Sequence, residues 1–424
     1  MRDETISIHA GYDVDSATKA VAIPIYQTVA YEFDSADHGA ALFNLEVPGH
    51  IYGRLSNPTT AVLERRLAAL EQGREALCVG SGAAAIHCAI SNLVQVGDNV
   101  VSLPQLYGAT FTLFEHVFRG QGVEVRFAEN CDPASVESRI DDRTRAIYCE
   151  SIANPAGTVA DVEALACVAH RNGVPLVVDN TIATPIVLKP ICHGADIVVH
   201  SLTKFLGGHG TTLGGAIIDS GKFPWREHRQ RFPMFNSPEP AYHGVNYVEH
   251  FGENAYIARC RTVGLRNMGP VLSPMSAFLL LQGIETLGLR MERHLNNSAR
   301  VANYLRGHER VSWTRYLGFN DDPCRALVQK YLGGRGPSFL TFGVRGGLEA
   351  GKKFYDALRL FKRLVNIGDA KSLACHPAST THRQLSPDEL ARVGVTPEML
   401  RLSIGIEHID DIIADLAQAL AASA

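Results

Sequence analysis

One lysine, Lys204, stands between an apolar run and a glycine-rich turn in the segment ADIVVHSLTKFLGGHGTTLGGAIID, residues 195–219. The same run brings Ser201 and Thr203 to its end, and earlier in the chain Asp179 directly follows the apolar run of PLVVDNTIATP. Both runs are typical of buried strands in a parallel sheet, whose carboxyl ends carry the site. At one sheet edge, the lysine amine could bind a carbonyl compound covalently. The carboxylate could stabilise a cationic group beside it.

Two further stretches place suitable groups at the same edge. The segment VGSGAAAIHCAI puts Ser81, Gly82 and Ala83 at a turn into a helix, whose free backbone N–H groups can bind an anion. The segment LPQLYGATF offers the flat ring of Tyr107 after another strand. Each feature alone has an ordinary structural explanation. Together, a lysine, a carboxylate, a ring and an anion cradle are the groups that pyridoxal phosphate requires.

The elements that must position these groups begin at about residue 60. A helix is predicted over AVLERRLAALEQ, and short apolar runs that read as strands follow at EALCVGSG, NVVSLP, VEVRFA, RAIYCE, PLVVDN and ADIVVH. Predicted helices separate most of these runs, which indicates a mainly parallel sheet covered on both faces. We therefore predict an α/β fold.

Three regions are predicted along the chain. Residues 1–60 carry prolines and aromatics without sustained periodicity, and they form an arm that must pack against another protein surface. Residues 61–270 form a large cofactor-binding domain, whose part after residue 207 reads as a long functional or partner-covered loop. Residues 271–424 resume a helical pattern and add strands at RVSWTRY, SFLTFGV and LRLSIGI with a closing helix. They form a smaller α+β C-terminal domain.

Composition excludes several classes of protein. The 424 residues are 46% hydrophobic and 20% charged, with a net charge of −4 and no long basic run, so neither nucleic acid nor a membrane is an expected partner. The N-terminus lacks a secretory signal and the most apolar segment is too short to span a bilayer, which favours a cytoplasmic protein. Nine cysteines without a CxxC pair indicate reduced thiols, and we expect no metal site.

The motifs HSLTKFLGGHG, VVDNTIATP, ESIANPAGT, VGSGAAAI, YGRLSNPT and RLSIGIEHIDDI resemble the Cys/Met-metabolism pyridoxal-phosphate enzymes, the cystathionine synthase/lyase family of fold type I. The resemblance covers nearly the whole chain. Within this family, IHAGYD, VNIGDAKSLACHPASTTHRQL and the long middle insertion resemble the O-acetylhomoserine sulfhydrylases. That group exchanges the acetyl group of O-acetylhomoserine for sulfide and releases homocysteine and acetate, as part of methionine biosynthesis.

The resemblance implies roles for the site residues. Lys204 would hold the cofactor and shuttle protons, Asp179 would keep its ring nitrogen protonated, Tyr107 would stack on the ring and Thr181 would lie beneath it. Other residues would contact the cofactor phosphate or the substrate. For the phosphate they are Gly82, Ala83, Ser201 and Thr203, with Tyr52 and Arg54 reaching the phosphate of the neighbouring subunit; for the substrate they are Asn154, Ser372 and Arg401, the last as a bidentate clamp on the α-carboxylate.

The resemblance also implies a homodimer as the minimal active unit, commonly paired into a homotetramer. One departure from the family bears on specificity. Where relatives that handle cystathionine typically carry a glutamate, this chain has Lys371. A lysine there would repel the distal ammonium of cysteine or cystathionine and favour hydrosulfide.

Two other interpretations remain open. A sister activity on the same fold would make or split cystathionine, or cleave methionine, and product identity would separate it from sulfhydrylation. A nucleotide-phosphate binding module is the alternative from another class, since glycines surround Lys204. However, in HSLTKFLGGHG the lysine precedes the glycines, which is not the GxxxxGK[ST] order.

Overall fold

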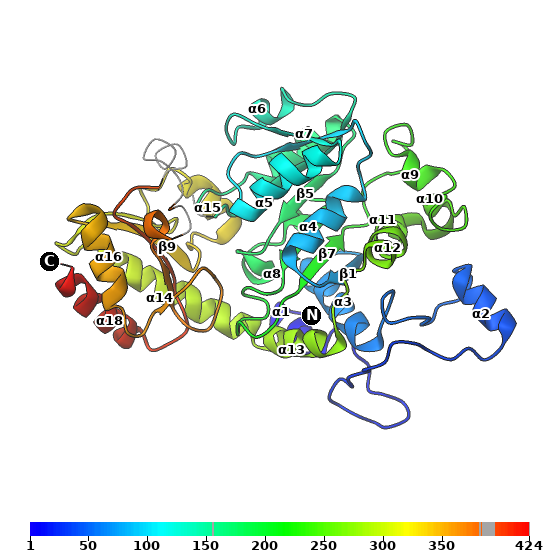
Figure 1. Cartoon of the computed structure of the whole chain (residues 1–424), viewed down its shortest axis with the longest axis horizontal. Coiled ribbons are helices and arrows are strands. Elements are labelled where there is room, and N and C mark those ends of the chain that lie inside the picture. The colour runs from blue at the N-terminus through cyan, green and yellow to red at the C-terminus, as the bar shows by residue number, and fades with distance from the viewer. Residues whose placement is uncertain (155–156, 381–382, 384–394, 424) are drawn as a thin grey trace.

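The computed structural model describes residues 1–154, 157–380, 383 and 395–423. Two residues of ESIANPAGT and the last part of VNIGDAKSLACHPASTTHRQL fall outside these ranges. Figure 1 shows two sheet-containing bodies side by side and a part of the N-terminal segment, around α2, that projects outward from them. None of the helices in the described ranges is both long and apolar enough to cross a membrane.

The larger body is built on a seven-stranded sheet of order β1-β7-β6-β5-β4-β2-β3. All neighbouring pairs are parallel except those of β7, which runs antiparallel to β1 and β6. The strands are β1 (Glu75–Val79), β2 (Asn99–Ser102), β3 (Glu124–Phe127), β4 (Thr144–Glu150), β5 (Leu176–Asp179), β6 (Ile197–Ser201) and β7 (Gly215–Asp219). The predicted, mainly parallel sheet is confirmed, while β7 was not predicted.

Successive residues of the central strands enter opposite hydrophobic layers. Val178 and Val198 join one layer, and Val177 and Val199 join the other. Continuous apolar runs are therefore required, as in any sheet covered on both faces. The first layer includes residues of α3 (Pro58–Glu71), α7 (Val162–Arg171) and α13 (Pro274–Glu285); the second includes residues of α4 (Gly82–Ser91) and of the π-helical turn Leu113–Phe118 that follows α5 (Gly108–Thr112). Short helices α6 (Pro133–Glu137) and α8 (Thr184–Val187) complete the connections.

The segment after β7 is folded rather than loop-like. Trp225, Phe232, Phe235 and Tyr256 are buried together in the second layer, and Trp225 stacks on Tyr256 with ring centroids 5.7 Å apart. The segment contains four short helices, α9 (Pro233–Asn236), α10 (Tyr247–Phe251), α11 (Ala255–Arg259) and α12 (Arg266–Met268), of which α9 carries Phe235 and α11 carries Tyr256. Its aromatic residues therefore form core, which the glycine and proline content of the sequence concealed.

The N-terminal segment contains two helices with different surroundings. Helix α1 (Asp3–His9) packs on α3, α13 and α14 (Leu287–Arg306). Helix α2 (Ala36–Phe43) projects outward in Figure 1 and meets the segment after β7 at its C-terminal end, where Phe43 O accepts from the Tyr242 hydroxyl at 3.1 Å. Several apolar side chains of this segment are exposed, among them Val21 at 81%. Burying apolar surface is favourable, so these exposed side chains would be stabilised by contact with another protein surface.

The smaller body contains a five-stranded sheet of order β10-β11-β12-β9-β8. It includes the three strands predicted there, and the short β10 and β11 are additional. The strands are β8 (Val311–Arg315), β9 (Phe339–Val344), β10 (Lys362–Arg363), β11 (Leu373–Cys375) and β12 (Met399–Ser403). Helices α15 (Arg325–Leu332), α16 (Gly347–Ala357) and α18 (Ile409–Ala422) accompany them, and α14 runs from one body into the other (Figure 1).

Candidate active site

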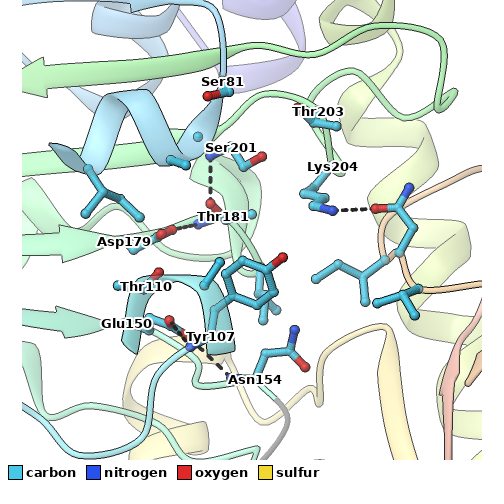
Figure 2. Close-up of a pocket in the computed structure, with 18 of the residues that line it drawn as sticks. Ser81, Tyr107, Thr110, Glu150, Asn154, Asp179, Thr181, Ser201, Thr203 and Lys204 are labelled. Carbon is cyan, nitrogen blue, oxygen red and sulfur yellow. Dashed lines mark hydrogen bonds between the residues drawn. The ribbon is translucent and has the colours of Figure 1, made fainter. Parts of the chain in front are cut away.

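A cavity of about 240 Å³ lies where the carboxyl ends of the central strands meet the smaller body. The ends of β4, β5 and β6 coincide, because Glu150 pairs with Asp179 and Asp179 with Val199 in the sheet register. Most residues predicted for the site line this one cavity (Figure 2). They are Gly82, Ala83, Tyr107, Asn154, Asp179, Thr181, Ser201, Thr203, Lys204 and Arg401.

Lys204 leaves the end of β6 in a tight turn, in which its N–H donates to Ser201 O at 3.2 Å. Its Nζ donates to Asn366 Oδ1 across the cavity (Figure 2). Burial lowers the pKa of Lys204, and the nearby positive charge of Arg401 lowers it further. A larger fraction of this lysine is therefore the neutral, nucleophilic amine at neutral pH than for a lysine in water.

The glycines after Lys204 make room for a buried arginine. Gly208 has φ +73°, and a Cβ there would lie 2.1 Å from the Arg290 guanidinium. That guanidinium donates to Phe205 O at 2.7 Å and to Leu206 O at 3.1 Å. Arg290 thus supplies hydrogen-bond donors to the carbonyls of the turn. Glycine at position 208 allows the turn to lie this close to the guanidinium. The turn holds the backbone of Lys204 in place.

An anion cradle lies beside Lys204 at the N-terminus of α4. Ser81 caps this helix by accepting from Ala84 N at 3.1 Å, and the N–H groups of Gly82 and Ala83 stand in the first turn, where no intrahelical carbonyl is available. A Cβ on Gly82 would lie 2.6 Å from Ser201 Cβ, so glycine permits the close approach of helix and strand. The helix dipole and free amides suit a phosphate.

Asp179 ends β5 at the floor of the cavity. Its Oδ1 accepts from Thr181 N at 2.9 Å, and its Oδ2 accepts from the Tyr148 hydroxyl at 3.5 Å. Burial is the main cause that raises the pKa of Asp179. Thr181 in turn accepts from Ser201 N at 2.8 Å through Oγ1, which joins the ends of β5 and β6 (Figure 2). A buried carboxylate of this kind is stabilised when a cationic ring nitrogen lies beside it.

Tyr107 and Arg401 reach the cavity from different bodies, Tyr107 from the turn after β2 and Arg401 from β12. The Tyr107 side chain is 47% exposed and projects into the space beside Lys204 in Figure 2. Arg401, on β12 of the smaller body, donates through Nη1 to Asn154 Oδ1 at 3.2 Å. Burial lowers the pKa of Arg401, but a guanidinium remains charged at neutral pH. An aromatic ring, an amine, a carboxylate and an anion cradle in one cavity fit pyridoxal phosphate, and Arg401 adds a cation for a substrate carboxylate.

Three predicted positions lie outside this cavity lining. Tyr52 and Arg54 belong to the N-terminal segment, where Arg54 donates to Arg266 O and stands 5.4 Å from the Tyr52 ring centroid. Ser372 is fully buried, and its Oγ donates to Glu407 Oε2 at 2.9 Å and accepts from Gly405 N at 2.9 Å. Its hydroxyl is therefore engaged within the smaller body. Lys371 also lies outside the lining and pairs with Asp369 at 2.8 Å.

Three polar residues of the cavity were not predicted, namely Thr110, Glu150 and Asn366. Glu150 occupies the end of β4 as Asp179 does the end of β5, so the same rule of polar residues at strand ends could have found it. Asn366 reaches Lys204 from the segment between β10 and β11. No local pattern marks an asparagine that meets a lysine 162 positions away in sequence.

Comparisons with known proteins identify the family of the chain. The family model described as Cys/Met metabolism PLP-dependent enzyme matches residues 4–421. The chain is 49% identical to the homocysteine synthase of Schizosaccharomyces pombe over 98% of this chain and 97% of that protein. It is 48% identical to O-acetyl-L-homoserine sulfhydrylase 1 of Thermus thermophilus over 99% of this chain and 100% of that protein.

A crystal structure extends the agreement to the fold. A chain of Campylobacter jejuni assigned as an O-acetylhomoserine (thiol)-lyase superposes with a TM-score of 0.95 and 41% identity, over 99% of this chain and 100% of that one. That structure contains N'-pyridoxyl-lysine-5'-monophosphate at position 205 of its own chain. The predicted fold and the predicted cofactor are both confirmed by these matches.

Proposed function

The chain belongs to the Cys/Met metabolism PLP-dependent enzymes, and from that premise we propose that it is an O-acetylhomoserine sulfhydrylase. The reaction replaces the acetate group on the γ-carbon of O-acetyl-L-homoserine with sulfide. Hydrosulfide and O-acetyl-L-homoserine are consumed, and L-homocysteine and acetate are released. The relatives named for this reaction match over almost the full length of the chain.

The observation that carries the proposal is the meeting of Lys204, Asp179 and Arg401 in one cavity. Pyridoxal phosphate, when bound, supplies an electron sink for bonds at the substrate α-carbon. The cradle at Gly82 and Ala83 would hold its phosphate, together with the Ser201 and Thr203 hydroxyls. Asp179 would hold a proton on the ring nitrogen, which favours the electron-withdrawing form.

The remaining residues orient the substrate and move its protons. Arg401 would bind the α-carboxylate with charge-assisted hydrogen bonds, and Asn154, which accepts from Arg401 Nη1, would orient the guanidinium. Lys204, with its lowered pKa, would take the proton from the α-carbon and then one from the β-carbon, and would return protons after sulfide has added. One flexible amine would serve both positions, because the α- and β-carbons are adjacent in the substrate.

The proposed active unit is a homodimer, with a homotetramer as the expected assembly. Tyr52 and Arg54 would serve the phosphate site of a neighbouring subunit, which the exposed apolar surface of the N-terminal segment supports. We also propose the division into a 1–60 arm, a 61–270 cofactor domain and a 271–424 C-terminal domain, of which α13 and the first half of α14 pack in the core of the larger body. The cytoplasm is the proposed compartment, since all nine cysteines are free thiols.

Product analysis tests the proposed function. Purified protein loaded with pyridoxal phosphate receives O-acetylhomoserine with sulfide, with cysteine, or with no nucleophile. The expected main product is homocysteine from the sulfide reaction, well above cystathionine from the cysteine reaction. Predominant cystathionine, or 2-oxobutanoate formed without any nucleophile, would instead assign the sister synthase or lyase activity. Lys204→Ala serves as the control for turnover that does not depend on the site.

A further inference from the structure

Glu150 is a buried carboxylate at the end of β4 that lines the cavity and is 6% exposed. Its Oε1 accepts from Tyr107 N at 2.5 Å, and its Oε2 accepts from Asn154 N at 3.3 Å. Figure 2 shows both hydrogen bonds. One side chain therefore holds the backbone of the turn after β2 and the backbone of the turn after β4.

A carboxylate is the side chain that this arrangement requires. A glutamine of the same shape offers one accepting oxygen, so its NH₂ group would face one of the two backbone N–H donors in either orientation. The charge is costly, because burial raises the pKa of Glu150 and the neighbouring carboxylate of Asp179 raises it further. The two N–H donors favour the ionised form and offset part of that cost.

The contacts of Glu150 continue to the substrate side of the cavity. Asn154, whose N–H binds Glu150, accepts from Arg401 Nη1 through its side-chain oxygen at 3.2 Å. A continuous path thus runs from the Tyr107 backbone through Glu150 and Asn154 to the Arg401 guanidinium. We propose that Glu150 is a positioning residue that sets the Tyr107 ring and, through Asn154, the Arg401 guanidinium at a fixed separation. This inference rests on the proposed function for the roles of Tyr107 and Arg401.

The sheet itself does not depend on the Glu150 side chain. Strands β4 and β5 are joined by backbone pairing, and Ser151 N donates to Asp179 O at 2.9 Å just beyond the strand ends. A substitution of Glu150 therefore changes the two turns while the strands that carry them stay paired. This separation makes a binding test informative.

The test compares Glu150→Gln with the wild-type protein in two titrations. Pyridoxal phosphate is titrated into the apo-protein, and L-norvaline, an amino acid without a leaving group, is titrated into the loaded protein, both followed by visible absorption. Both dissociation constants are expected to rise about tenfold, or ~1.4 kcal/mol. Glu150→Asp keeps the charge but is one methylene shorter, so its dissociation constants are expected to lie between those of wild type and Glu150→Gln. This second variant keeps the test decisive if Glu150→Gln does not fold.

Asp415→Asn is the matched control. Asp415 is another buried carboxylate that accepts from backbone N–H groups, here those of Arg359, Leu360 and Phe361, and it lies outside the cavity lining. This variant is expected to keep both affinities. Dissociation constants of Glu150→Gln within twofold of wild type would overturn the proposal, and so would an equal loss in Asp415→Asn.

A double-mutant cycle separates positioning from general destabilisation. If Glu150 acts on Arg401 through Asn154, the loss of norvaline affinity in the double variant Glu150→Gln with Asn154→Ala is expected to be smaller than the sum of the single losses. Additive losses would contradict the proposed path. Failure of the wild-type protein to make homocysteine would overturn the proposed function alone, since these titrations measure binding without turnover.

Discussion

The hydrogen bond from Arg401 to Asn154 joins the two bodies of the molecule at the cavity. Arg401 lies on β12 of the smaller sheet, and Asn154 follows β4 of the larger one. The proposed carboxylate clamp is therefore complete only when both bodies are in contact. Affinity for the substrate carboxylate thus reports directly on how the bodies are packed.

Replacing Arg401 with lysine is expected to weaken substrate binding. Lysine keeps the charge but loses the planar fork that can bind a carboxylate and Asn154 together. We expect KM for O-acetylhomoserine to rise at least tenfold, the size of a lost hydrogen bond between charged groups. Steady-state kinetics measure this change, and Asn154→Ala should raise KM less. An unchanged KM in Arg401→Lys would remove Arg401 from the substrate site.

Replacing Lys204 with alanine is expected to abolish both covalent cofactor binding and turnover. The visible absorption of the purified protein should lose the band of the lysine-bound cofactor, and homocysteine formation should fall at least 10³-fold, within the range for loss of a general base and covalent anchor. Lys330→Ala, which removes a lysine paired with Asp161 and Glu163, is the control and should keep both. An intact band in Lys204→Ala, without added amines, would show that Lys204 does not bind the cofactor covalently.

The structure changes the expectation for Lys371. Its ammonium pairs with Asp369 at 2.8 Å and lies outside the cavity lining, so its charge is compensated. We expect Lys371→Gln to leave the ratio of homocysteine to cystathionine, measured in a mixture of sulfide and cysteine, within about twofold of wild type, because neither Lys371 nor Asp369 lines the cavity. A large increase in cystathionine would support the repulsion inferred from the sequence.

Stability is expected to fall on mild acidification because of His294. This side chain is fully buried, its Nδ1 lies 2.7 Å from Ile404 O, and burial lowers its pKa to about 4. The unfolded chain binds a proton near pH 6.5 while the folded chain stays neutral, so stability decreases as the pH falls from 6.5 towards 4. The expected contribution at pH 5 is a loss of ~2 kcal/mol.

Urea unfolding at pH 7 and pH 5 measures this loss, and the comparison with His294→Asn isolates it from other groups. The variant lacks the titrating ring, so its unfolding free energy should change less between the two pH values. Equal pH dependence in the two proteins would show that His294 does not contribute. The variant is expected to be less stable than wild type at pH 7, because it loses packing against Phe205.

Much of the fold could be predicted because burial on both faces leaves a local signature. The runs that end at Asp179 and Ser201 are continuous and apolar, and the structure places them as adjacent strands β5 and β6. Strand β7 was missed because the glycines before Ala216 signal a turn and conceal the strand that follows. The aromatic cluster around Trp225 was missed because its partners, such as Tyr256, are distant in sequence.

The site could be predicted where strand ends deliver it and not where the second body does. Lys204 and Asp179 follow from the rule of carboxyl ends, and their roles stay predictions. Asn366 approaches from a different sheet, and no spacing in the sequence encodes that approach. Ser372 illustrates the converse: this serine belongs to a matching motif, but in the structure its hydroxyl donates to Glu407 and it lies outside the cavity lining.

Helix α14 has a consequence for the folding of the whole chain. Its first half places Leu287, Met291 and Leu295 in the core of the larger body, and its second half places Val301 and Leu305 in the core of the smaller one. A rigid rod of about 30 Å thus belongs to two cores at once. A cut anywhere along it would expose apolar surface on both sides. Neither half of the enzyme is therefore expected to survive as an isolated fragment, and the two cores should melt in a single transition.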